Sequence, residues 1–377
     1  MKFRAERTEF GEAVTWVLRT VGARATLPAL SGVRMETRGD ELLLSSTDLE
    51  IAGELTIAVQ GGRDGVALVP GRLLGDIVRS LPAAAVSAEM EQDLLRLHCG
   101  RAQFAIRLMP LEDFPAPAAP AAASDATMPA DEFARTVGQV GRAASADDAR
   151  PVLTGVQLEV TADGLTASAT DSYRLAMRTV PWQQDLTETV LVPRRALEEA
   201  RRAAEQQGGE VALSFTEPQV VFRFRDRYLS TRLIEGKFPD VRQLVPAGYE
   251  RRLKVERAPF MEVVRRVSVV GETTNTATPV TLHLSADTVR VTASSGEVGD
   301  AEEALPATLE GDDLEIAFNP RYLTDGLDAA ASDEVYLEFR DELKPAVIRP
   351  VEAEDDADAG QDHAAADFLY LLMPVRV

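Results

Sequence analysis

Cysteine and histidine are both scarce in this chain. One cysteine, Cys99, stands among 377 residues, so no disulfide can form within the chain, as is usual for proteins of a reducing compartment. The three histidines, His98, His283 and His363, are scattered, whereas a zinc site needs three or four converging ligands. His98 and Cys99 are neighbours on an expected strand and would point to opposite faces. The sequence therefore predicts no disulfide and no metal site.

Other absences restrict the function. Forty Lys and Arg residues stand against 61 Asp and Glu, a net charge of −21, which argues against a uniformly basic surface but leaves room for a basic strip. No stretch approaches the ~18 uninterrupted apolar residues of a membrane span, and the charged start MKFRAERTEF lacks an apolar secretory core. No Gly-x-Gly-x-x-Gly, Walker or Gly-x-Ser-x-Gly motif occurs. We expect a soluble, intracellular protein without catalytic residues.

An internal repeat organises the chain. The segments 27–50 and 150–175 both contain Pro-x-Leu-(Ser/Thr)-Gly, at 28–32 and 151–155, and both reach Thr-Asp nineteen positions after the proline. A third, shorter copy begins at Pro279 and keeps only the alternating apolar residues. The chain is therefore predicted to contain three related units.

Each repeat is preceded by a segment with helical periodicity. Apolar residues at i, i+4 and i+7 form one stripe in each segment, and we expect the helices to begin near Thr8, Asp131 and Pro259. The stripes are Phe10, Val14 and Val17; Phe133, Val137 and Val140; and Phe260, Val264 and Val267. A second helix in each unit is predicted to open at Pro70, Pro193 and Asn319, with proline in the first turn and an arginine two residues after the opening.

The rest of each unit is predicted to form strands. Val156, Leu158 and Val160 alternate with polar residues, as do Phe104, Ile106 and Leu108. A Pro/Ala run at 115–124 is a linker, and a shorter break lies at 246–249. We predict domains at 1–120, 127–246 and 250–377, each an α+β domain with two helices packed on six to eight short antiparallel strands.

The acidic residues favour structural roles. Asp48 and Asp171 each follow a threonine at equivalent places in separate units, which favours a turn or cap over a pair of catalytic acids. The acidic run 352–362 is expected to be a solvated loop. Calcium binding by this run is the alternative, which a thermal-shift titration with calcium would test.

Arginines recur on the predicted helices of every unit. They could be ordinary solubilising residues, but repetition would collect them on one basic surface while the acidic excess lies elsewhere. They are Arg19, Arg72, Arg79, Arg135, Arg142, Arg194, Arg195, Arg201, Arg202, Arg265, Arg266 and Arg321.

A set of motifs resembles one protein family over essentially the whole chain. MKF, TLPALSG…SSTDLE, RPVLTG…ATDSYRLAM, GKFPD, FNPRY and LLMPVRV, in this order, resemble the bacterial sliding clamp, the beta subunit of DNA polymerase III, in its actinobacterial form. The resemblance implies three similar domains and a head-to-tail dimeric ring around duplex DNA. It further implies a cytoplasmic, nucleoid-associated processivity factor that is not an enzyme, needs no cofactor and binds the polymerase III alpha subunit, the clamp loader and other repair and replication proteins.

The resemblance also implies a pocket for short apolar partner peptides. One wall corresponds to Arg150, Leu153, Thr170, Ser172, Tyr173, Arg174, Leu175, Pro239 and Leu244. The other corresponds to Asn319, Tyr322, Leu343, Pro345, Leu371, Met373, Pro374, Val375 and Arg376. The alternative is that these are only core residues of two domains.

Two further sets follow from the resemblance. The DNA-facing residues would be Arg24, Arg72, Arg79, Arg142, Arg195, Arg201, Arg202, Arg265 and Arg321. The dimer interface would place Phe104 and Ile106 against Val269 and Val270.

The chain departs from the common family pattern at Ser172, Gln243 and 151–152. These departures leave two alternatives open: a second-copy clamp with altered inhibitor binding, and a ring-shaped scaffold that recruits partners without a role in replication.

Overall fold

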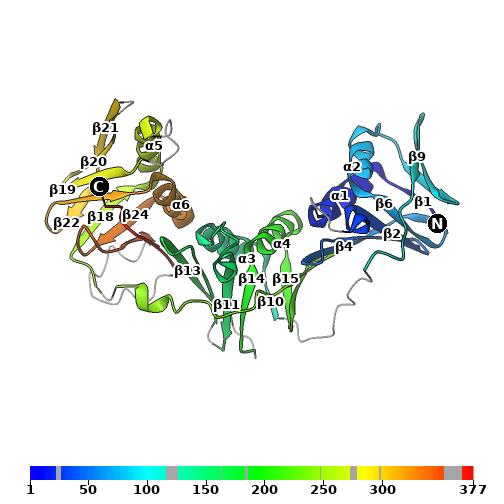
Figure 1. The fold of residues 1–377 in the computed structure, drawn as a ribbon, viewed down its shortest axis with the longest axis horizontal. Helices are drawn as coiled ribbons and strands as arrows, with labels where there is room; N and C mark the ends of the chain where they lie inside the picture. The colour runs from blue at the N-terminus through cyan, green and yellow to red at the C-terminus, as the bar shows by residue number, and fades with distance from the viewer. Residues whose placement is uncertain are drawn as a thin grey trace. The chain divides into compact units, whose positions relative to one another are not determined.

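The computed structural model describes residues 1–22, 27–115, 126–162, 164–182, 186–246, 248–271, 278–296, 299–351 and 367–376. They form two compact units, one of 1–134 with 195–233 and one of 135–194 with 234–377. Both units consist of helices lying against antiparallel sheets (Figure 1). Most of the predicted linker and the acidic run 352–362 lie outside the described residues. The predicted boundaries at 120, 127, 246 and 250 stay a prediction.

The predicted number of helices, two for each repeat, is confirmed in the described part of the chain. The helices are α1 (Arg7–Val17), α2 (Gly71–Ser80), α3 (Ala130–Val140), α4 (Arg194–Gln207), α5 (Arg257–Ser268) and α6 (Pro320–Ala330). Thr8, Asp131 and Pro259 lie one or two positions inside their helices. In α1 and α5 the preceding residue is a glutamate in extended conformation that makes no side-chain cap, so the first turn starts earlier than the capping pattern predicted.

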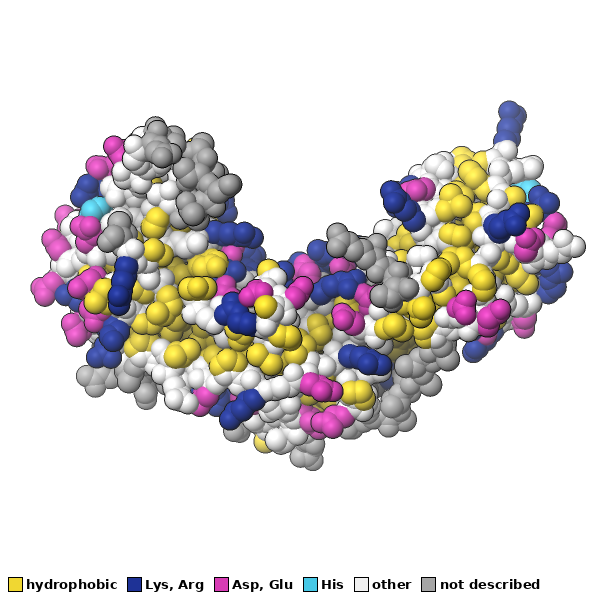
Figure 2. Space-filling model, in the orientation of Figure 1, with side chains coloured by type: hydrophobic (Ala, Val, Ile, Leu, Met, Phe, Trp, Pro, Cys, Tyr) yellow, Lys and Arg dark blue, Asp and Glu magenta, His cyan; other side chains and the backbone are white. Residues whose placement is uncertain are grey.

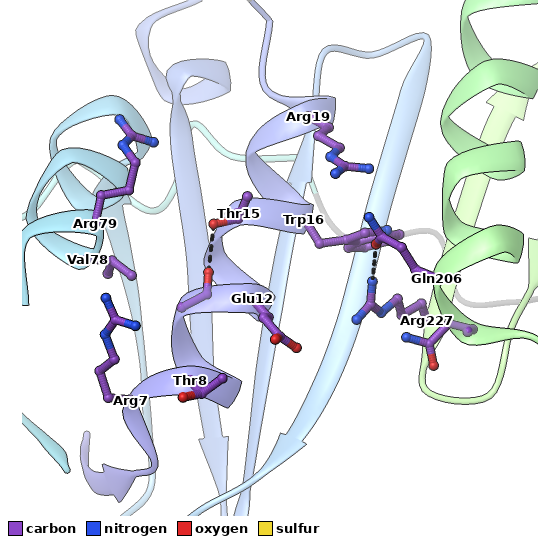
Figure 3. A pocket seen from close by; sticks show the side chains of 12 residues that line it. Arg7, Thr8, Glu12, Thr15, Trp16, Arg19, Val78, Arg79, Gln206 and Arg227 are labelled. Carbon is purple, nitrogen blue, oxygen red and sulfur yellow. Dashed lines mark hydrogen bonds between the residues drawn. The ribbon is translucent and has the colours of Figure 1, made fainter. Parts of the chain in front are cut away.

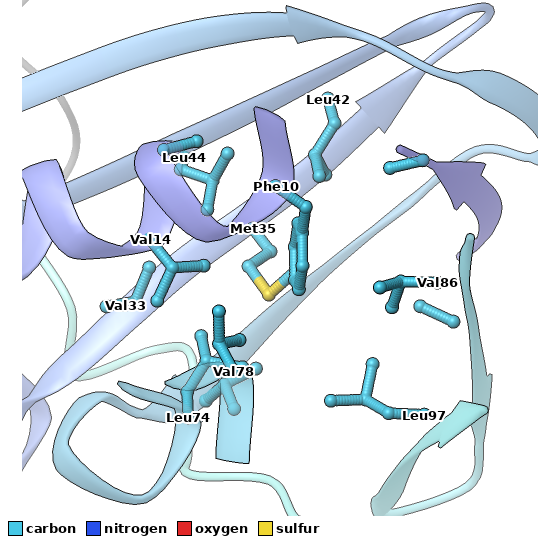
Figure 4. Packing of buried hydrophobic residues seen from close by; sticks show 14 of the residues in the cluster. Phe10, Val14, Val33, Met35, Leu42, Leu44, Leu74, Val78, Val86 and Leu97 are labelled. Carbon is cyan, nitrogen blue, oxygen red and sulfur yellow. The ribbon is translucent and has the colours of Figure 1, made fainter. Parts of the chain in front are cut away.

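The predicted apolar stripes are buried in all three repeats. Phe10, Val14 and Val17 of α1 are fully buried, and the corresponding residues of α3 and α5 are at most 5% exposed. In Figure 4, Phe10 lies beside Met35 and Val14 lies beside Val33, both of the sheet that the helix covers. The 3.6-residue periodicity therefore identified the core face of each helix correctly.

The second helices begin where predicted, but their prolines act differently. Pro70 and Pro193 are the last residues of the strands before α2 and α4, and only Pro320 occupies the first turn. At α6 the side chain of Asn319 accepts hydrogen bonds from the backbone N–H groups of Arg321 and Tyr322, at 3.0 and 3.4 Å. Asn319 is thus an ordinary N-cap.

The first unit holds a five-stranded and an eight-stranded sheet. The first has the order β5 (Gln60–Arg63), β1 (Lys2–Ala5), β7 (Val86–Glu91), β8 (Leu94–Cys99) and β9 (Ala102–Arg107). The second has the order β10 (Ala126–Pro129), β15 (Glu210–Thr216), β16 (Gln219–Arg223), β17 (Arg227–Arg232), β4 (Ile51–Ala58), β3 (Glu41–Thr47), β2 (Gly32–Arg38) and β6 (Gly65–Pro70). In this sheet, β17 joins β4 although the two strands belong to different repeats.

The second unit holds a nine-stranded and a four-stranded sheet. The larger has the order β14 (Glu188–Pro193), β11 (Gly155–Thr161), β12 (Gly164–Thr170), β13 (Arg174–Pro181), β26 (Phe368–Leu372), β25 (Ala346–Pro350), β24 (Glu334–Phe339), β18 (Arg251–Glu256) and β22 (Thr308–Glu310). The smaller has the order β21 (Gly299–Pro306), β20 (Thr288–Ser295), β19 (Val280–Ser285) and β23 (Leu314–Phe318). The predicted alternation in β11 is confirmed, since Val156, Leu158 and Val160 are buried.

The repeated Pro-x-Leu-(Ser/Thr)-Gly motif has the same structure in both copies. It forms a short 3-10 turn in which Ser31 and Thr154 each donate to the proline carbonyl, at 2.7 and 2.8 Å. The closing glycine starts a strand where there is no space for a side chain. A Cβ on Gly32 would lie 2.7 Å from Leu68, and one on Gly155 would lie 2.7 Å from Ile234. Close packing therefore explains why both copies end in glycine.

Candidate functional site

Five large hydrophobic side chains of the two predicted pocket walls are exposed. Tyr173 is 59% exposed, Leu343 56%, Leu244 52%, Met373 39% and Val375 37%. We call these five residues the apolar patch. Figure 2 shows hydrophobic side chains gathered at the surface around the position of β13 in Figure 1. Exposed apolar groups in this number typically mark a binding surface, because water contact is unfavourable for each of them.

A buried hydrophobic cluster lies beside the apolar patch. Its members come from β13, β14, β25, β26 and the segment after β17, and the patch residues adjoin them along the chain or the sheet. The cluster consists of Leu175, Leu191, Phe238, Val241, Val347 and Leu371. It depends on the pairing of β13 with β26, in which Leu175 faces Leu371. The Tyr173 carbonyl also accepts a hydrogen bond of 2.9 Å from the Met373 backbone.

The Thr-Asp pairs form turns, as predicted. Thr170 Oγ1 accepts from the Ser172 backbone at 3.1 Å, and Asp171 Oδ1 accepts from the Tyr173 backbone at 2.9 Å. Ser172 has a φ of 82°, which side-chain-bearing residues rarely adopt. The equivalent turn of the first repeat has the same hydrogen bonds, with Leu49 at a φ of 78°. Each aspartate thus accepts backbone hydrogen bonds from its own turn.

Arg174 is buried beneath this turn, although the resemblance implied a place in the pocket wall. Its Nε donates to Asp171 at 2.9 Å, and its Nη1 donates to Asp325 at 2.5 Å and to the Tyr370 hydroxyl at 3.2 Å. Burial opposes its charge, but Tyr370 and the two carboxylates outweigh this and raise the pKa of Arg174. Burial raises the pKa of Tyr370, because it disfavours the charged phenolate. Arg174 is therefore a fully charged structural anchor.

Two aromatic rings lie between the anchor and the surface. The Tyr173 and Tyr322 rings stack with their centroids 6.4 Å apart and their planes 27° apart. The Arg174 guanidinium lies 4.4 Å from the centroid of the Tyr322 ring, within cation–π range. On the outer side, Arg150 Nη1 donates to Ser172 Oγ at 3.1 Å.

The predicted pocket residues all lie in the second unit but differ in exposure. The buried ones are Leu153, Thr170, Arg174, Leu175 and Leu371. The half-buried ones are Asn319, Tyr322, Pro345 and Pro374. The exposed ones are Arg150, Ser172, Tyr173, Pro239, Leu244, Leu343, Met373, Val375 and Arg376. Sequence reasoning missed Phe238, Val241 and Val347, which belong to the buried cluster. Phe238 carried a signal, since Phe-Pro closes both of the first two repeats.

A basic cavity of about 550 Å³ lies over the outer face of α1 in the first unit. In Figure 3, Arg7 and Arg79 lie on one side of α1, and Arg19 and Arg227 lie on the other with Trp16. Glu12 is the one acidic residue among those lining the cavity. Arg7 Nε is buried without a hydrogen-bond acceptor in the described part of the chain, whereas Arg19 Nη1 lies 3.8 Å from Glu199 Oε2. Guanidinium groups in such a place are suited to phosphate oxygens.

Arg7 and Arg227 were not among the residues predicted to face DNA. Arg227 lies on strand β17, where its Nη1 donates to Gln206 at 3.3 Å and its guanidinium lies 5.6 Å from the Trp16 ring. Arg227 was not predicted because only arginines on the expected helices were considered.

The arginines that were predicted to face DNA divide into two groups. Arg72, Arg265 and Arg321 are exposed and make no ion pair within the described residues, and the last two line a cavity of about 290 Å³ between α5 and α6. Arg79, Arg142, Arg195, Arg201 and Arg202 are each paired with a carboxylate. Arg24 lies outside the described residues.

The residues predicted for the dimer interface are not equally available. Val269 is 59% exposed, and Phe104 and Val270 are half-buried. Ile106 is only 1% exposed and belongs to the core of its own unit. Its alternation along β9 with Gln103 and Ala105 directs it inward.

Within the described ranges, no three His, Cys, Asp or Glu residues come together in a way that could hold a metal ion. The run considered for calcium, 352–362, and His363 lie outside these ranges. No helix of the described part combines the length and apolar character needed to cross a membrane.

Profiles of three domains of one protein match successive parts of the chain. They are the N-terminal, central and C-terminal domains of the DNA polymerase III beta subunit, at residues 1–118, 127–240 and 242–360. The beta sliding clamp of Streptomyces coelicolor is 37% identical over 388 residues and covers 100% of both chains. The beta sliding clamp homolog GriR of Streptomyces muensis is 32% identical, covering 100% of this chain and 99% of its own.

Solved structures agree with these matches. The DNA polymerase sliding clamp from Bacillus subtilis superposes with a TM-score of 0.91 at 26% identity, covering 100% of this chain and 99% of its own. The sliding clamp from Bartonella birtlesii bound to griselimycin has a TM-score of 0.90 at 29% identity, with both chains fully covered. The α+β fold of three clamp domains and the resemblance drawn from the sequence motifs are thereby confirmed. The chain belongs to the bacterial sliding clamps, the beta subunits of DNA polymerase III.

Proposed function

We propose that this chain is a processivity factor, which closes as a dimer around duplex DNA and holds a replicative polymerase to it. The observation that carries this proposal is the similarity to beta sliding clamps over the full length of the chain. Such a protein acts by topology and needs no catalytic group of its own. We infer that it works on DNA in the cytoplasm, at the nucleoid.

The apolar patch is the proposed docking site for a short apolar peptide of a partner. The five exposed side chains beside a buried cluster support it, since mostly apolar surfaces with a few polar groups bind such ligands. Related clamps from Bartonella birtlesii and Pseudomonas aeruginosa were solved bound to griselimycin, which supports a ligand site in this family. The expected partners are the polymerase III alpha subunit, the clamp loader and other repair and replication proteins.

The proposed DNA-facing surface consists of arginines that contact phosphates. Three of the arginines predicted from the sequence are exposed without an ion pair in the described part of the chain, and the basic cavity over α1 adds Arg7. Contacts to the DNA backbone carry no sequence information and weaken with salt, as a sliding protein requires.

Two sheet edges support head-to-tail dimerisation. β9 ends the five-stranded sheet and β21 ends the four-stranded sheet, so both have unpaired backbone groups. Exposed Arg107 lies on β9, whereas exposed Asp300 lies on β21. Opposite charge and free strand edges would suit pairing of β9 of one chain with β21 of its partner.

Retention on circular DNA tests the proposed function. The protein is loaded onto nicked circular DNA by the host clamp loader and separated by gel filtration at high salt. We expect it to stay with the circle, to leave after linearisation, and to stay on linear DNA whose ends are blocked by bound protein. Retention on linear DNA with free ends, or no retention on circles, would contradict topological holding.

Two alternatives lead to different outcomes. A scaffold without a role in replication would bind partner peptides but would not be retained on circles. A second-copy clamp with altered inhibitor binding would be retained but would bind griselimycin weakly.

A further inference from the structure

The turn at residues 171–174 carries the most exposed member of the apolar patch. Tyr173 follows directly after Ser172, whose φ of 82° is unfavourable for a residue with a side chain. Such a turn persists only where neighbouring contacts hold it. Tyr173 is 59% exposed, and its turn is held by hydrogen bonds to Thr170 and Asp171 and, on the outer side, by Arg150.

Arg174 reinforces these contacts from beneath the turn. Its guanidinium binds Asp171, and the same aspartate accepts the backbone N–H groups of Tyr173 and Arg174, at 2.9 and 3.1 Å. The side chain of Arg174 is 9% exposed. A buried guanidinium is fixed only when carboxylates meet its charge, since it has lost its water.

Asp325 on α6 is the second carboxylate. It lies 151 positions from Arg174 in the chain, and its Oδ2 is 2.5 Å from Arg174 Nη1. Its side chain is 30% exposed, and it is not part of the apolar patch. Without its charge, Arg174 would retain one carboxylate and the Tyr370 hydroxyl.

Tyr322 connects the same guanidinium to the surface. Its ring contacts the Arg174 guanidinium and stacks against the Tyr173 ring, and its carbonyl accepts a hydrogen bond of 3.0 Å from the Tyr370 hydroxyl. A shift of the guanidinium would therefore move the ring against which Tyr173 rests. One buried charge thus controls both the backbone and the ring of the patch residue.

We propose that Asp325 is a positioning residue for the partner peptide. Through Arg174 it holds the 171–174 turn and the Tyr322 ring, so that Tyr173 is already in its binding position before the peptide arrives. Preorganisation of this kind strengthens binding because less freedom is lost on association. This inference rests on the proposed function of the apolar patch.

The inference is tested by measuring how tightly the Asp325→Asn variant binds a peptide. The probe is a fluorescein-labelled pentapeptide, Ala-Leu-Ser-Leu-Phe, whose apolar side chains suit the patch, and its binding is measured by fluorescence anisotropy on the full chain. We expect the variant to remain folded, as judged by circular dichroism, and to bind about tenfold more weakly. The matched control is Asp328→Asn on the same helix, whose carboxylate pairs with Arg142 at 2.5 Å and does not contact Arg174. This control should bind within twofold of the unmodified chain.

A double-mutant cycle separates positioning from general stability. In a Tyr173→Ala background, Asp325→Asn should weaken binding no further, because the residue that it positions is absent. A weakening of the same size in the Tyr173→Ala background would overturn the inference in favour of a purely structural role. Equal affinity of Asp325→Asn and the unmodified chain for the peptide would also overturn the inference, but it would leave the proposed function of the apolar patch unchanged. Failure of the unmodified chain to bind the peptide would overturn the proposed patch function, and the inference with it.

Discussion

Ile106 and Phe104 lie two positions apart on β9 but in different surroundings. Ile106 is 1% exposed within the core of the first unit, whereas Phe104 is half-buried at its margin. We expect Ile106→Ala to lower the free energy of unfolding by about 2–5 kcal/mol, because the truncation leaves a cavity. Chemical denaturation followed by circular dichroism would measure this decrease.

Phe104→Ala is the matched comparison for Ile106→Ala. Its ring is packed only partly against the core, so its removal should affect unfolding less and self-association more. Sedimentation velocity would show whether it shifts the chain toward monomer. If Ile106→Ala were instead the variant that dissociates the dimer at full stability, the distinction between core and interface residues on β9 would be wrong.

The helices differ in how far their arginines are neutralised. On α4, Arg201 and Arg202 pair with Glu198, Glu199 and Glu205 of the same helix. Arg265 of α5 and Arg321 of α6 have no such partner within the described residues. Helical ion pairs at this spacing compete with phosphate for the guanidinium. Elements with free arginines should therefore contribute more to DNA binding.

The salt dependence of DNA binding tests this difference between helices. Arg265→Gln combined with Arg321→Gln should lower the slope of log K against log salt by about 0.9 for each phosphate that the protein no longer neutralises. Arg201→Gln combined with Arg202→Gln should lower it less, since these groups already have carboxylate partners. The slopes would be measured by fluorescence anisotropy on a labelled duplex at several salt concentrations. Equal slopes for the two double variants would mean that neutralisation within α4 has no bearing on DNA binding.

At the scale of the whole molecule, the net charge of −21 excludes tight binding to DNA by a uniformly basic surface. A closed ring removes the need for such binding. We therefore expect sedimentation equilibrium to give twice the mass of one chain over a wide range of concentration. A head-to-tail contact that closes after two copies stops assembly there. A mass that grows with concentration would indicate open-ended association and would argue against a closed ring.

The local features of this protein were readable from its sequence. The stripes of α1, α3 and α5, the start of α6 at Asn319 and the turns at Thr47 and Thr170 depend on neighbours within a few positions, so periodicity and residue type predicted them. The repeat and the motifs also led to the family, which full-length similarity confirmed.

Only the tertiary structure decided which residues reach the surface. Alternation along β9 or β13 indicates two faces but cannot say which one another strand or helix will cover. The pairing of β13 with β26 and the contact of Arg174 with Asp325 join segments more than a hundred positions apart, and they buried Leu175 and Arg174 while leaving Tyr173 exposed. For the same reason Arg227, on a strand, lines one cavity with Arg7 of α1 and with Arg19, which follows α1. Such contacts depend on strand register and packing across the whole unit, which no local pattern of residues contains.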